Sequence, residues 1–181
     1  MIASLGQITQ GHLLVVPLKH ICSLRDLGNE DIREVENLRA DVRSTLQETY
    51  GACVFFEHGI RTGGSGGCGI DHAHMHAVPV TGEGVLKTLT REFRGRSIQC
   101  LAEIKRSRNP NSSYLYFEDA SAQQYIFPVS NLPSQHMRKL VAESIGKSDW
   151  DWRKCGHEPE VISTVQRLAP LFSAVGTPQR G

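Results

Sequence analysis

The sequence predicts an α+β fold in which an antiparallel sheet of about five strands packs against one long helix. Two observations support this fold class: short runs rich in β-branched and aromatic residues, and one long stretch whose apolar residues recur at helical spacing. The order strand, helix, strand, loop, strand is typical of such a sheet. We expect a main domain over residues 1–130 and a C-terminal helical extension over 131–181 that packs on the same domain.

The first predicted element is a buried strand over 12–18, because HLLVVPL is almost wholly apolar. A helix is expected from Asn29, whose side chain can cap the first turn, to Tyr50, with Gly51 as its stop. Strands should follow over 52–57 and in the run HAHMHAVPV, which ends near Pro79. The apolar positions of the helix are Ile32, Val35, Leu38, Val42 and Leu46.

Beyond Thr81 the pattern predicts a short helix over 85–93, a strand over 98–104, and two strands, SYLYFED and QQYIFPV, joined around 119–122. A further helix begins after Pro133 and stops at Gly146, and a tail helix begins at Glu158 and is broken at Pro170. Their inward positions are Met137, Leu140, Val141 and Ile145, then Val161, Val165 and Leu168.

Composition excludes several classes of protein. The 181 residues carry a net charge of +1, so no global field recruits nucleic acid or a membrane surface. The cysteine count is odd and no CxxC pair occurs, which argues against a disulfide framework and a zinc ribbon. With neither a signal peptide nor a long apolar span, we expect a soluble, cytoplasmic protein. The cysteines are Cys22, Cys53, Cys68, Cys100 and Cys155.

Three histidines alternate along one apolar run, directly after a glycine-rich loop over Thr62–Gly69. In a strand, His72, His74 and His76 share one face. The outer two would stand roughly 13 Å apart, too far for one zinc ion whose bonds to nitrogen are about 2 Å. An extended anion suits such a row better than a metal ion, so we expect no metal and no cofactor.

The pattern His72-x-His74-x-His76 with two apolar residues after it, the upstream run GHLLVVPLKH and the segment FFEHG together resemble the histidine triad superfamily. The resemblance implies a nucleotide hydrolase in which His74 attacks an α-phosphorus and forms a covalent nucleotidyl-histidine. His76 and His12 would donate to the phosphate oxygens, and His72 would buttress the row. A main-chain carbonyl that accepts one N–H of His74 would hold the reactive tautomer.

Further candidate substrate-binding residues are the loop amides of Gly67, Cys68 and Gly69, the strand-end carboxylate of Glu57, and residues near the next helix start. The chain departs from the family at two positions: Gly69 stands where relatives carry a hydroxyl residue, and Ser4 stands where they carry a ribose-binding acid. The remaining candidates are Gln135, Arg138 and Trp152.

Several alternatives stay open: a regulatory nucleotide-binding module with little turnover, a nucleotidyltransferase, or a metalloenzyme that uses His72 and His74 with His12, His58 or Cys68. The resemblance also implies a homodimer that pairs through the helix over 29–50 and an edge strand. In such a dimer, residues 150–153 of one chain would supply a pocket wall to the other.

Overall fold

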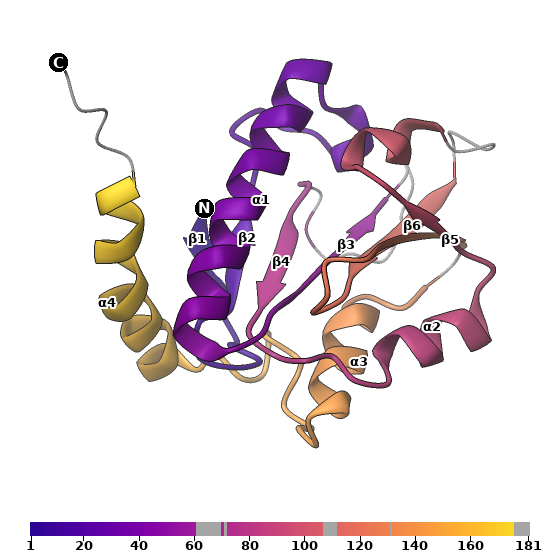
Figure 1. Cartoon of the computed structure of the whole chain (residues 1–181). Helices are drawn as coiled ribbons and strands as arrows, with labels where there is room; N and C mark the ends of the chain where they lie inside the picture. The colour runs from indigo at the N-terminus through magenta and orange to yellow at the C-terminus, as the bar shows by residue number, and fades with distance from the viewer. Residues whose placement is uncertain (61–69, 71, 107–111, 131, 176–181) are drawn as a thin grey trace, which may run out of the picture.

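The computed structural model describes residues 1–60, 70, 72–106, 112–130 and 132–175 and has an α+β fold with one antiparallel sheet (Figure 1). Seven strands lie in the order β1-β2-β4-β3-β6-β7-β5. The strands are β1 (Ile2–Ala3), β2 (Leu13–Val15), β3 (Val54–Gly59), β4 (Met75–Val78), β5 (Arg96–Ile98), β6 (Ser113–Glu118) and β7 (Gln124–Val129). The helices are α1 (Asn29–Tyr50), α2 (Val85–Glu92), α3 (His136–Ser144) and α4 (Glu158–Val175), with short 3₁₀ helices at Leu24–Asp26 and Leu101–Arg106.

The α+β class is confirmed, but the sheet has seven strands in place of about five. The additional strands, β1 and β5, have two and three residues, too few to show an alternating pattern. The strand expected over 98–104 is wrong, because β5 ends at Ile98 and a 3₁₀ helix follows. Leu101 and Ile104 are both buried at a spacing of three, and the Glu36 carboxylate accepts the N–H of Leu101 at 2.7 Å.

The helix α1 has the predicted bounds, but its cap differs from the expectation. Gly28, not Asn29, is the N-cap residue, and the Asp31 carboxylate accepts its N–H at 3.2 Å. Gly51 ends the helix as expected, with a φ of 90° that favours glycine. The break expected at Pro170 is wrong: α4 continues past it, because Pro170 is exposed and water can satisfy the carbonyl that loses its partner.

The two faces of the sheet are covered by different helices (Figure 1). Phe55 and Met75 pack with α1 on one face, whereas Phe56 and Val78 pack with α2 and α3 on the other. Because side chains alternate along a strand, His76 lies on the same face as Phe56. The candidate site therefore lies on the face covered by α2 and α3, away from the long helix.

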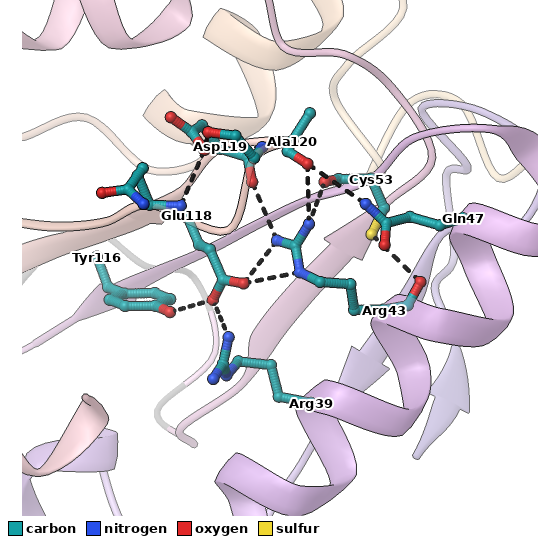
Figure 2. A network of polar contacts seen from close by, with 10 residues as sticks. Arg39, Arg43, Gln47, Cys53, Tyr116, Glu118, Asp119 and Ala120 are labelled. Atoms are coloured by element: carbon teal, nitrogen blue, oxygen red, sulfur yellow. Dashed lines mark hydrogen bonds and ion pairs between the residues drawn. The ribbon is translucent and has the colours of Figure 1, made fainter. Parts of the chain in front are cut away.

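A buried carboxylate fastens α1 to the sheet (Figure 2). Glu118 on β6 is wholly buried and receives ion pairs from Arg39 and Arg43 of α1, the latter at 2.6 Å. The Tyr116 hydroxyl donates to the same carboxylate at 2.5 Å, and Arg43 also donates to the Asp119 carbonyl at 3.0 Å. Both carboxylate oxygens of Glu118 thus have charged or hydroxyl donors, which offsets much of the cost of burying the charges.

We expect Glu118→Ala to lower the free energy of unfolding by about 3–5 kcal/mol, because it leaves two buried guanidinium groups without their carboxylate. Urea denaturation checks this. The matched control is Arg91→Ala, which removes an exposed pair with Glu92 at 3.6 Å and should cost less than about 1 kcal/mol. Equal losses in the two variants would contradict the role given to Glu118.

Candidate functional site

A cavity of about 240 Å³ opens on the face covered by α3. Its floor is formed by β2, β3 and β4, one wall by the first turn of α3, and the other by residues 2–5 and Trp152. Its polar lining residues are Ser4, His58, His74, His76, Gln135, His136 and Arg138. Its apolar lining residues are Ile2, Ala3, Leu5, Leu14, Phe56, Ile70, Met137 and Trp152.

His74 lies on the cavity with a defined tautomer. Its Nδ1 lies 2.7 Å from the His72 carbonyl oxygen, which only accepts, so Nδ1 carries the proton. In the neutral ring, Nε2 then carries an unprotonated lone pair. Burial lowers the pKa of His74, Arg138 lowers it further, and the bond to the His72 carbonyl opposes the shift. The ring is therefore neutral at pH 7, as a nitrogen nucleophile must be.

His76 receives its tautomer from a chain of hydrogen bonds. The Ile8 N–H donates to His12 Nδ1 at 3.3 Å, so the proton of neutral His12 is on Nε2. That Nε2 lies 2.9 Å from His76 Nδ1 and donates to it. The proton of His76 is consequently on Nε2, which makes His76 a hydrogen-bond donor for the cavity. Burial lowers the pKa of both rings well below the ordinary value, so both are neutral.

His12 is wholly buried and does not line the cavity. The structure places it behind His76, in place of the expected direct contact with phosphate. Gln7 fixes its main chain: the amide accepts the N–H of His12 at 3.1 Å and donates to its carbonyl at 2.9 Å. Thr164 of α4 donates to Gln7 at 2.9 Å and accepts the N–H of Gly11 at 2.8 Å. Gly11 has a φ of 90°, which favours glycine directly before this histidine.

Of the three histidines in the motif, His74 and His76 line the cavity and His72 does not. His72 and His74 precede β4, which begins at Met75, so the three histidines do not form one continuous strand row. The His72 ring is held by the Pro17 carbonyl at 2.8 Å and by His20 at 3.3 Å. Gly67, Cys68 and Gly69 fall outside the described residues.

Glu57 points to the opposite face of the sheet from His58 and His76. Its carboxylate accepts the Leu24 N–H at 2.8 Å and the Tyr114 hydroxyl at 2.5 Å. It is buried, and burial raises its pKa to about 7. These contacts connect the segment before α1 to the sheet. Glu57 does not line the cavity.

Gln135 and Trp152 form part of the wall in the same chain. The Gln135 side-chain amide accepts the Trp152 N–H at 3.2 Å and donates to the Asp151 carboxylate at 2.7 Å. Gly6 packs so closely on Trp152 that an added Cβ would lie 2.6 Å from the tryptophan Cβ. A partner chain is therefore not needed to bring Trp152 to the site, and dimer formation stays a prediction.

Sequence reasoning missed the apolar end of the cavity. Ile2 and Leu5 line it, but a two-residue strand leaves no periodic signal. His58 also lines it, and here a signal existed: Phe56 and His58 alternate along β3, and Phe56 pairs with His76. Burial lowers the pKa of His58 to about 4, so it too is neutral at pH 7.

The described residues contain neither a candidate metal site nor a candidate membrane span. No group of three or more His, Cys, Asp or Glu side chains is arranged there to hold a metal ion. No described helix combines the length and apolar character needed to cross a bilayer.

Comparison with known proteins connects the first half of the chain to a described family. The model described as "Scavenger mRNA decapping enzyme C-term binding" matches residues 6–89, which include His12, His74 and His76. CWF19-like protein 1 of Homo sapiens is 25% identical over 178 residues, which cover 90% of this chain and 31% of that protein. The mouse protein is 24% identical over 164 residues, which cover 83% of this chain and 29% of that protein.

This chain thus spans less than a third of the length of these curated relatives. The matched family model is itself similar to the histidine triad fold. Together these matches support a relationship of this chain to the histidine triad superfamily.

Proposed function

We propose that this chain is a nucleotide hydrolase that cleaves a phosphoramidate, a dinucleoside polyphosphate or a related phosphoanhydride. The observation that carries the proposal is the bond from His74 Nδ1 to the His72 carbonyl at 2.7 Å, which leaves Nε2 unprotonated beside the cavity. A neutral imidazole held in this tautomer is an effective nucleophile toward phosphorus.

The reaction proceeds in two displacements. His74 Nε2 forms a bond to the α-phosphorus while the bond from phosphorus to the leaving group breaks, and the leaving group departs with the electron pair and takes a proton from water. A second water then attacks the phosphorus, loses its proton to solvent and releases His74. His76 Nε2–H donates to a non-bridging oxygen, where charge accumulates in both steps.

His12 acts through His76 and not on the substrate. By donating to His76 Nδ1 at 2.9 Å, it keeps the His76 proton on the nitrogen that faces the cavity. Hydrolysis is favoured over nucleotidyl transfer because the resemblance associates glutamine at the third position with transferases, whereas this chain has His76.

We expect His74→Ala to abolish hydrolysis of adenylylated model substrates, because the nucleophile is lost. His76→Ala should slow the reaction by about 10²–10³, as is typical of removing one donor to the developing charge. Turnover assays and mass spectrometry of acid-labile adducts on His74 check this. The control is Arg91→Ala, which removes an exposed side chain of α2 that does not line the cavity. Full activity of His74→Ala would refute the mechanism, and nucleotide binding without turnover by the wild type would favour the regulatory module.

The pH profile provides a second test. Neutral His74 is the reactive form, and its folded-state pKa lies below the ordinary 6.5. The acid limb of the kcat/KM profile should therefore have its midpoint below pH 6.5, because activity is lost as the ring gains a proton. An acid limb with its midpoint at or above 6.5 would contradict a neutral, buried nucleophile.

Hydrolysis should survive removal of metal from the protein. The proposed nucleophile is His74 and the proposed hydrogen-bond donor to the phosphate is His76, and neither needs a metal ion. Dialysis against a chelator, followed by assay in metal-free buffer, checks this. Loss of activity that zinc alone restores would instead support a histidine-ligated metal site.

A further inference from the structure

Among the described residues that line the cavity, one carries a positive charge and none carries a negative charge. Among the described residues that line it, Arg138 alone has a formal charge at neutral pH, because the histidines are neutral and no described lining residue is acidic. Burial lowers the pKa of Arg138 to about 10, which still leaves it protonated at pH 7. An anion is therefore the group that the cavity lacks.

Every partner of this guanidinium among the described residues is neutral. Arg138 is 4% exposed, and it donates to the Trp150 carbonyl at 3.0 Å, to the Gly6 carbonyl, and to the Ser4 hydroxyl at 3.4 Å. No carboxylate in the described part of the chain forms an ion pair with it. The Asp151 carboxylate acts on it only from a distance and accepts the Gln135 amide at 2.7 Å. A buried charge with only neutral partners is costly unless a ligand compensates it.

The position of Arg138 indicates which part of a nucleotide it faces. The histidine floor holds the reacting phosphate, and Ile2, Leu5 and Trp152 form the apolar region suited to a base. Arg138 contacts Ser4 of the wall and the Trp150 carbonyl, and its charge also lowers the pKa of His74 and His76. Because it contacts the wall at Ser4 and also acts on both histidines, we assign Arg138 to the sugar that connects base and phosphate.

The side chains at this position, Ser4 and Arg138, favour an anionic group on the ribose over its two free hydroxyls. Ribose hydroxyls are commonly bound by a carboxylate, whereas an arginine in that role accommodates a phosphate on the ribose. Here Ser4 donates its hydroxyl to the Leu5 carbonyl at 2.9 Å, and Arg138 lies beside it. Resting on the proposed function, we infer that the preferred substrate is a nucleotide whose ribose carries a second phosphate on its 2′ or 3′ oxygen.

Equilibrium binding to the wild-type protein tests this without requiring turnover. Calorimetry would compare adenosine and guanosine 5′-monophosphates with the 3′,5′- and 2′,5′-bisphosphates of the same nucleosides. The bisphosphate should bind at least about tenfold more tightly, as is typical of a hydrogen bond to a charged group. The two bisphosphates distinguish the 2′ from the 3′ position.

Two variants connect the preference to Arg138. Arg138→Gln removes the charge, and Ser4→Asp neutralises it while leaving the guanidinium contacts to the main chain. Both should abolish the preference for the bisphosphate, and thermal melting establishes that each is folded. The matched control is Arg153→Gln, which removes an exposed arginine that packs over the Trp152 ring at 5.1 Å and should keep the preference.

The outcomes separate this inference from the proposed function. Equal affinity of the wild type for monophosphates and bisphosphates would overturn the second phosphate and leave the hydrolase proposal standing. A preference that survives in folded Ser4→Asp would overturn the role of Arg138. Failure of every nucleotide to bind would overturn both proposals.

Discussion

The candidate site depends on how the main chain around His12 is held. Gln7 satisfies both the N–H and the carbonyl of His12, and the Ile8 N–H fixes the ring's tautomer. This backbone donor sets the direction of the next hydrogen bond, from His12 to His76. The remaining proton of His76 then faces the cavity. A backbone N–H can only donate, so the order of protons in the row has one solution while the rings are neutral. The tautomers of two rings, His12 and His76, are thus set by one peptide group.

Buried arginines occur on both faces of the sheet, and their partners differ. Arg39 and Arg43 meet the Glu118 carboxylate, and this compensated cluster joins α1 to the sheet. Arg138 on the other face donates to the Trp150 and Gly6 carbonyls and lines the cavity. The first arrangement is complete within the chain. Under the inference drawn above, a bound anion would complete the second, and this difference separates the structural face of the sheet from its proposed functional face.

Sequence reasoning predicted those parts of the fold that leave a long or repeated signal. Periodicity predicts the bounds of α1 and the strands β6 and β7. The histidine motif predicts that His74 and His76 lie in the same site. It did not predict β1 and β5, which are too short for a period, or the 3₁₀ helix at Leu101, which a distant glutamate fixes. The burial of His12 behind His76 and the inward charge of Arg138 depend on contacts between distant segments, which no local pattern encodes.

The bond of Thr164 to Gly11 has a consequence for how the protein is made. It joins residues 153 positions apart, and α4 lies beside the N-terminal strand in the folded chain (Figure 1). During synthesis the sheet and α1 can form while α4 is still inside the ribosome, but the support behind His12 cannot. Contacts of such long sequence separation form slowly, because the intervening chain must first be ordered. The chain therefore acquires its overall shape before its candidate chemistry, and nascent or prematurely terminated chains would have the first without the second.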